Sequence, residues 1–232
     1  MKKITEKKIK SLLREEIKNN VYHVYENENG FTFDSLFLEK QIFQIEDVHE
    51  INLIYENIKN HYMTIDYFEK LWNLKRGFKL DWFQNVSQEV MEFRGEEYYY
   101  KLLGDVLVDI EFFHDAKYDV LDLLRFGINP RLMMNEVENL SFDNLPDSLT
   151  IYRGFSIKDD KLEIEDFVSL SWTLDYNKAV WFSDRHCGLK QIILKCEIKK
   201  DEVLSYFTRR KESEIIVDFE ILENNRIEII EI

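Results

Sequence analysis

Apolar positions recur every three or four residues through most of the first 145 residues, which is the spacing of amphipathic helices. Predicted helices with one apolar face cover residues 4–20, 48–58, 67–72 and 86–93, and another lies near 132–137. The stretch Tyr98–His114 is apolar on more than one side, so we expect this helix to be buried. Residues 21–45 mix aromatic and polar positions around Asn29-Gly30, a turn signal, and are predicted to form a loop or short strands.

After Pro146 the apolar period shortens to two, which is the period of strands. Alternate residues of one predicted strand share a face: Ile192, Leu194, Cys196 and Ile198. On that face we expect Cys196 to act as a small core hydrophobe. Two further stretches, 218–223 and 226–232, flank Asn224-Asn225, and this pattern predicts a β-hairpin at the end of the chain.

Helices first and strands later predict an α+β fold rather than alternating βαβ units. The boundary falls near Pro146, with a mainly helical region at 1–145 and a β-rich region at 146–232. The 232 residues are 45% apolar, enough for a sizeable core. Two prolines and seven glycines argue against long linkers.

Membrane and secretion signals are missing from the sequence. It has no run of eighteen apolar residues, and no apolar segment follows the N-terminal lysines. Cys187 and Cys196 are too few for a disulfide framework and lack the spacing of zinc ligands. We therefore expect a cytoplasmic protein with reduced thiols and no membrane partner.

The formal charge of −14 lowers the expectation of general nucleic-acid binding, because an acidic chain repels phosphate at long range. A local basic groove remains open as an alternative. The acidity also suits a basic partner or a substrate that presents arginines.

Two carboxylates stand two residues apart at Glu212 and Glu214, directly before the apolar segment Ile215-Ile216-Val217. On a strand they would point the same way and Ser213 the opposite way. Two acids held side by side repel each other, which costs stability. Their pairing therefore indicates a site where negative charge is used to bind or form a cation.

Two earlier segments carry matching chemistry. Tyr152-Arg153-Gly154 ends a short predicted strand with a cation and with a glycine that lets backbone approach a ligand. In Ser171-Trp172-Thr173 the two hydroxyls share one strand face, and Asp175 is predicted to cap the helix that follows.

Taken in order, these three motifs resemble the arginine–serine–glutamate class of ADP-ribosyltransferases, the class of cholera toxin, in its bacterial or phage forms. The resemblance covers about the last 85 residues. It implies that 146–232 is an NAD-binding core built as a mixed, mainly antiparallel β-sandwich. The helical region 1–145 would pack on this catalytic domain or form part of it.

The resemblance also implies roles for individual residues. Glu214 would stabilise the oxocarbenium-like transition state formed when NAD loses nicotinamide, and Ser171 would hold its carboxylate. Glu212 would orient the acceptor or take its proton. Arg153 would pair with the pyrophosphate, because a guanidinium fork suits it. Gly154 would leave backbone groups open to nicotinamide.

The remaining NAD-binding candidates are Tyr152, Thr173, Phe182 and Arg210. Trp181, Tyr206 and Phe207 are alternative stacking residues for nicotinamide or the acceptor. The chain departs from the usual Ser-Thr-Ser at Trp172, which must find room on the opposite face. It also has three consecutive cations at 209–211, so that Arg209 and Arg210 are candidates for binding phosphates of NAD or of a nucleic acid.

Other chemistry has weaker support. Glu111 and His114 have the spacing of a helical metal-ligand pair, but a second such pair is missing. His186-Cys187 has no acidic orienting residue nearby in the sequence, and no phosphate-binding glycine loop occurs. We therefore expect NAD as substrate and no metal.

The resulting hypothesis is a mono-ADP-ribosyltransferase acting as a toxin, effector or phage-conflict protein, with protein arginine as acceptor. The alternatives are a transferase that modifies RNA or DNA, an NAD glycohydrolase, and an inactive nucleotide-binding module. An active enzyme of this kind would endanger its own host, so an inhibitory antitoxin or immunity partner is also expected.

Overall fold

The computed structural model describes residues 23–27, 30–34, 59–110, 116–157, 167–185, 190–210, 212–222 and 227–232, with only the backbone for those up to 34. Contacts divide the chain into two compact units, Met1–Ile65 and Asp66–Ile232. In the first unit, β1 (His23–Asn27) and β2 (Gly30–Asp34) pair antiparallel, so short strands flank the predicted turn. The predicted helices at 4–20 and 48–58 lie outside the described residues.

The second unit begins with a helical layer that covers five α-helices and two 3₁₀ helices among the described residues. In chain order these are α3 (Tyr67–Trp72), η1 (Arg76–Phe78), α4 (Lys79–Arg94), α5 (Glu96–Asp109), α6 (Lys117–Arg125), η2 (Pro130–Met133) and α7 (Glu136–Asp143). The helices predicted at 67–72, 86–93 and 98–114 are confirmed as α3, α4 and α5, as far as Asp109. Gly95, with φ of 80°, separates α4 from α5, because this backbone conformation favours glycine.

Helix α5 is the buried centre of this layer, as its all-round apolar pattern predicted. Its buried residues are Tyr99, Tyr100, Leu102, Leu103, Gly104, Val106 and Leu107. The hydroxyl groups of Tyr99 and Tyr100 donate to the backbone carbonyls of Leu123 and Leu124, at 2.9 and 2.8 Å. These bonds satisfy two buried phenols and join α5 to α6.

The strands follow as an antiparallel sheet in the order β6-β7-β4-β3-β5-β8. Their bounds, with the helices between them, are β3 (Ser148–Ile157), β4 (Ser171–Thr173), α8 (Tyr176–Asp184), β5 (Lys190–Lys199), η4 (Lys200–Glu202), β6 (Val203–Phe207), β7 (Glu214–Val217), η5 (Phe219–Ile221) and β8 (Ile227–Glu231). Helices followed by an antiparallel sheet confirm the predicted α+β class. Cys196 is 1% exposed, so its place in the core is also confirmed.

The sheet is continuous on one side of β3 and almost broken on the other. β3 pairs with β5 along its full length, from Ser148 opposite Lys199 to Ile157 opposite Lys190. Among the described residues β3 and β4 share one residue pair, Tyr152 opposite Thr173. The two strands therefore diverge beyond this pair, and a pocket lies at the divergence.

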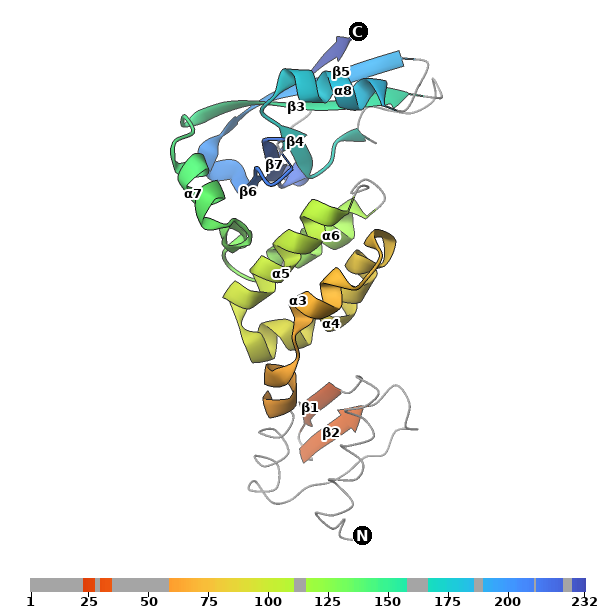
Figure 1. Ribbon diagram of the computed structural model, residues 1–232, viewed down its shortest axis with the longest axis vertical. Helices are drawn as coiled ribbons and strands as arrows, with labels where there is room; N and C mark the ends of the chain where they lie inside the picture. Colours follow the sequence, from red (N-terminus) through yellow and green to blue (C-terminus); the bar gives the residue numbers. More distant parts are fainter. Residues whose placement is uncertain are drawn as a thin grey trace. The chain divides into compact units, whose positions relative to one another are not determined.

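Helix α8 and helices α3–α6 lie on opposite sides of the sheet (Figure 1). Asp175 caps α8 as predicted, because its side chain accepts a hydrogen bond from the backbone N–H of Asn177 at 2.8 Å. The helix lies so close to β3 that a Cβ on Gly154 would be 1.7 Å from the backbone oxygen of Ala179.

The prediction of a β-hairpin at the end of the chain is wrong. Residues 219–221 form η5 instead of a strand, and β8 pairs with β5. The Asp218 side chain accepts from the backbone N–H of Glu220, and Arg125 of α6 forms ion pairs with both acids. These contacts stabilise a helical turn where the apolar pattern alone indicated a strand.

Two predictions in the helical region also need correction. The helix expected near 132–137 is divided between η2 and α7, and α7 begins at a capping box formed by Asn135 and Glu138. Val137 is 67% exposed and Trp72 is 72% exposed, so neither belongs to the core.

The pattern had located no separate helix at α6. No helix in the described part of the chain is long and apolar enough to cross a membrane.

Candidate active site

The pocket between β3 and β4 has a volume of about 320 Å³ and is lined by β3, β4, α8, the start of β7 and the end of α5. All nine site residues expected from the sequence line it: Tyr152, Arg153, Gly154, Ser171, Thr173, Phe182, Arg210, Glu212 and Glu214. They come from segments up to 62 residues apart in the sequence, from Tyr152 to Glu214. Sheet pairing of β4 with both β3 and β7 brings the three motifs together.

Ser171 contacts two of the charged residues that line the pocket, Glu214 and Arg153. Its hydroxyl donates to Oε1 of Glu214 at 2.5 Å, and its backbone oxygen accepts from Nη1 of Arg153 at 2.6 Å. The pairing of β4 with β7 sets Thr173 opposite Glu214 and Ser171 opposite Ile216, so the hydroxyl reaches Glu214 diagonally. One serine therefore fixes a carboxylate and a guanidinium together.

Arg153 is oriented by backbone carbonyl groups. Besides Ser171, it donates from Nε to the oxygen of Phe167 at 2.9 Å. Burial lowers the pKa of Arg153 to about 10, and the Glu214 charge opposes this shift. The guanidinium is therefore charged at neutral pH and adds a fixed positive charge to the pocket.

Burial raises the pKa of Glu214 from its ordinary 4.5 to about 7, and the charge of Glu212 acts in the same direction. The Ser171 hydrogen bond and the charges of Arg210 and Arg153 oppose the rise. Glu214 is therefore present in both protonation states near neutral pH. The carboxylate form becomes dominant as the pH rises through 7.

Glu212 lines the pocket but does not lie on the strand, contrary to the expected strand geometry. β7 begins at Glu214, and Ser213 has a φ of 46°, in the left-handed region. The backbone oxygen of Glu212 accepts from the Thr173 hydroxyl at 2.6 Å, and that of Ser213 accepts from the Leu174 N–H at 3.1 Å. A turn fixed by these two bonds, instead of strand alternation, brings the acids to one pocket.

The two consecutive arginines before Glu212 have different surroundings. Arg210 lines the pocket, donates from Nη1 to the oxygen of Val108 at 2.7 Å, and approaches Glu212 at 3.9 Å. Arg209 forms ion pairs with Asp105 and Glu138 in the helical layer. Arg209 is thus engaged by protein carboxylates, and Lys211 lies outside the described residues.

The structure shows that Gly154 has a packing role, and backbone access for a ligand at this residue stays a prediction. The close approach of Ala179 in α8 excludes any side chain at this position. Tyr152, two residues earlier on the same strand, packs edge-on against Tyr176 of α8 with ring centroids 5.4 Å apart. Gly154 and Tyr152 both line the pocket, and both contact α8 and so hold it on β3.

Of the four candidates for stacking on nicotinamide or the acceptor, one lines the pocket and three do not. Phe182 lines the pocket. Tyr206 and Phe207 are 7% and 2% exposed and pack in the core, and Trp181 is 52% exposed on α8. None of these three is among the pocket residues. Trp172 is buried and donates from its indole nitrogen to the Ser169 oxygen at 2.8 Å, so the bulky residue finds a place in the core.

Sequence reasoning missed several pocket residues. Arg185 follows Phe182 by three positions, so helical spacing alone would have placed it on the same face. Phe155 lies two residues after Arg153 on β3 and stacks on Phe167, with ring centroids 4.0 Å apart. Leu107 lies in α5 and Ile110 directly follows it, and no local pattern connects them with the later strands.

The described residues contain no group of three or more His, Cys, Asp or Glu side chains that could hold a metal ion. Glu111, His114, His186 and Cys187 lie outside those residues. No protein-family model, curated protein or solved structure matches the chain.

Proposed function

We propose that the protein is an NAD-dependent mono-ADP-ribosyltransferase whose active site is the pocket between β3 and β4. The observation that carries this proposal is the pair of bonds made by Ser171, one to Glu214 and one to Arg153. The resemblance predicted a carboxylate, a hydroxyl and a guanidinium from three strands around one nucleotide-sized space. The residues of that prediction line a single pocket.

In the proposed reaction the bond between C1′ of the ribose and the nicotinamide nitrogen breaks. Its electron pair goes to the nicotinamide, which leaves as a neutral ring, and positive charge develops on C1′ and the ring oxygen of the ribose. Glu214 as carboxylate stabilises this charge, because fixed negative charge at the reacting atoms lowers the barrier. Arg153 and Arg185 would bind the pyrophosphate, and Phe182 would stack on nicotinamide.

The second carboxylate favours a cationic acceptor. Glu212 lines the same pocket as Glu214, and Arg210 approaches its carboxylate at 3.9 Å. An arginine side chain of a target protein would be attracted by these acids, and Glu212 would take the proton released when its nitrogen attacks C1′. Arginine is therefore the proposed acceptor, and a nucleic acid or water is tested against it.

The test uses NAD labelled in the adenine ring, incubated with purified protein and a bacterial lysate. The wild-type protein should release nicotinamide and transfer label to macromolecules, and protease should free that label while RNase leaves it in place. Glu214→Gln should reduce both reactions at least about hundredfold. Glu231→Gln, which removes an exposed acid of β8, is the matched control and should keep wild-type rates.

Different outcomes separate the alternatives. Label freed by RNase instead of protease would identify a nucleic acid as the acceptor. Free ADP-ribose and nicotinamide appearing at equal rates would identify a glycohydrolase. Calorimetric NAD binding without any nicotinamide release would indicate an inactive nucleotide-binding module and would disprove the enzymatic proposal.

A further inference from the structure

Glu138 is a completely buried carboxylate in α7, with 0% of its surface exposed. Its Oε2 accepts from the backbone N–H of Asn135 at 2.9 Å, which completes the capping box of α7. Its Oε1 accepts from the backbone N–H of Thr208 at 3.0 Å and from Nε of Arg209 at 3.1 Å. The same side chain therefore begins a helix and holds the segment that follows β6.

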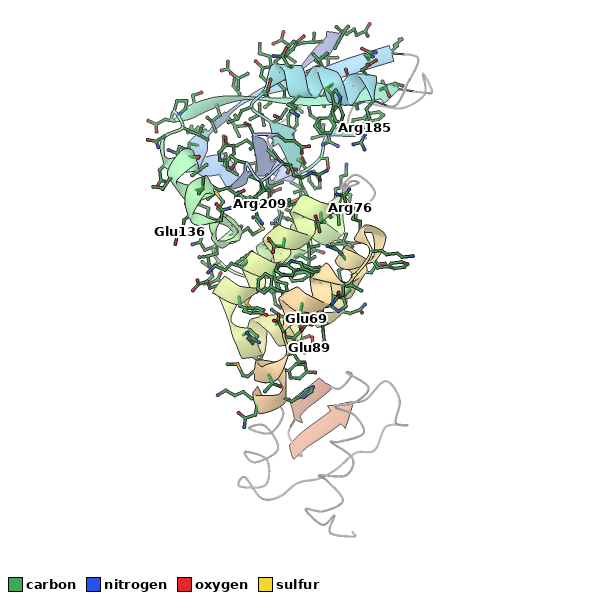
Figure 2. The ribbon with its side chains drawn as sticks, viewed as in Figure 1. Glu69, Arg76, Glu89, Glu136, Arg185 and Arg209 are labelled. Carbon is green, nitrogen blue, oxygen red and sulfur yellow. The ribbon has the colours of Figure 1, made fainter. Side chains whose placement is uncertain are left out.

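Arg209 extends this attachment to two more helices. It forms an ion pair with Asp105 of α5, donates from Nη2 to the oxygen of Met133 at 2.8 Å, and lies over the Phe207 ring at 5.0 Å from its centroid. Figure 2 shows Arg209 where the sheet meets the helical layer. Three helical elements thus contact one guanidinium from the sheet.

This attachment lies immediately before the acids of the pocket. Arg210 donates to the oxygen of Val108, also in α5. Glu212 follows two residues later at the left-handed turn, and Glu214 begins β7. Glu214 has the Ser171 bond and strand pairing to hold it. Glu212 lies before β7; its backbone oxygen is held by the Thr173 hydroxyl, and the chain enters this turn from Arg209 and Arg210.

A buried ionic cluster is a poor device for stability alone. Each charge loses hydration, and apolar groups of similar volume are often as good or better. The cluster does fix the orientation of Arg209, because charge-assisted hydrogen bonds hold a guanidinium in one orientation. Since Arg209 lies close to Glu212 in the chain, the cluster can also orient Glu212.

We propose that Glu138 is a positioning residue, which fixes Thr208 and Arg209, and with them the chain that leads to Glu212, so that Glu212 faces the acceptor. This inference rests on the proposed function. It assigns the helical layer a part in the reaction: the layer determines how ADP-ribose is divided between the acceptor and water. When the turn is loose, water still reaches C1′ and Glu214 still stabilises the transition state, but the acceptor is poorly aligned.

The test is Glu138→Gln in the full chain, because the one carbonyl oxygen of glutamine can still accept from Asn135 in the capping box. Its amide nitrogen is a donor, so it cannot replace the oxygen that accepts from Thr208 and Arg209. Transfer of label from NAD to lysate macromolecules, divided by release of free ADP-ribose, should fall about tenfold or more. The KM for NAD should stay within about twofold, because Arg153, Arg185 and Phe182, which are proposed to hold NAD, lie outside the loosened segment.

Asp105→Asn, which removes the other carboxylate on Arg209 from a less buried position, should act in the same direction. Glu136→Gln is the matched control, since this exposed acid lies in the first turn of the same helix and points outward (Figure 2).

Amide hydrogen exchange gives a second measurement that does not depend on activity. In Glu138→Gln, exchange at residues 205–214 should accelerate, and exchange in β3 and β5 should not change. A lower melting temperature with unchanged product division and unchanged exchange in this segment would overturn the proposal. If the wild-type protein cleaves no NAD, the proposed function fails and the acceptor role fails with it. Exchange would still decide whether Glu138 holds the turn.

Discussion

β3, β5 and β8 form a regular antiparallel ladder, in which β3 and β5 pair over ten residues, whereas β4, β6 and β7 pair over a few residues each and the pairing of β6 with β7 is irregular. The first group supports the fold, and of its three strands only β3 contributes residues to the pocket between β3 and β4. The second group contains the half-buried carboxylate of Glu214 and its serine, Ser171, and the left-handed turn at Ser213 directly precedes β7. Features that lower the stability of the fold thus lie in the less regular group of strands. The regular group supplies the stability that offsets them.

Gly154 is where the regular half supports the pocket, and its replacement should have the largest effect. In Gly154→Ala the new Cβ would collide with the backbone of Ala179, which cannot move without displacing α8. We expect the free energy of unfolding to fall by about 3 kcal/mol or more, measured by denaturant titration.

Gly77→Ala is the control for this change, because a Cβ at Gly77 meets no atom within 4 Å, and it should stay within about 1 kcal/mol of wild type. Wild-type stability in Gly154→Ala would show that α8 is not fixed by this contact.

Glu214 should destabilise the protein at high pH, since folding raises its pKa from 4.5 to about 7. The folded state holds the proton more tightly, so this contribution to stability is complete below pH 4.5 and is lost as the pH rises through 7. Glu214→Gln should therefore be more stable than wild type at pH 8, by on the order of 1–3 kcal/mol, and similar to it at pH 4.

Thermal unfolding across this pH range would measure the difference. Glu197→Gln, in the regular half, removes one exposed negative charge and should not show the same pH dependence. Equal pH profiles for wild type and Glu214→Gln would contradict the raised pKa.

Ser171→Ala should have the smallest of these effects. The hydroxyl holds Glu214 and lowers its pKa, so its loss should reduce the rate of NAD cleavage about tenfold, the worth of one hydrogen bond. It should also move the rise of the rate to a higher pH.

Initial rates from pH 5 to 9 test both effects, with Ser141→Ala on α7 as the control. An unchanged pH profile would mean that Ser171 does not act through Glu214.

Local signals predicted much of what the structure shows. The helices α3, α4 and α5 and the capping of α8 by Asp175 follow from spacing within short segments. The gathering of the three motifs in one pocket was implied by the resemblance and results from the pairing of β4 with β3 and β7. The alternation in β5 correctly placed Cys196 in the core.

Features that depend on distant partners were not accessible in this way. Residues 218–223 have an apolar content suited to a strand, but Arg125, almost a hundred residues earlier, pairs with Asp218 and Glu220 beside η5. Leu107 and Ile110 lie in and directly after α5, a helix whose sequence pattern is that of ordinary core, and only tertiary packing brings them to the pocket. Glu138 was hidden for the same reason, because its partners Thr208 and Arg209 are about seventy residues away.

The contact of α8 with Gly154 has a consequence for redesign. Because the backbone of α8 lies against the backbone of β3 at Gly154, the distance between the helix and the sheet is already at its minimum. No residue smaller than glycine exists that could reduce this distance. Attempts to change the width of the pocket should therefore vary Phe182 and Arg185 and leave β3 unchanged.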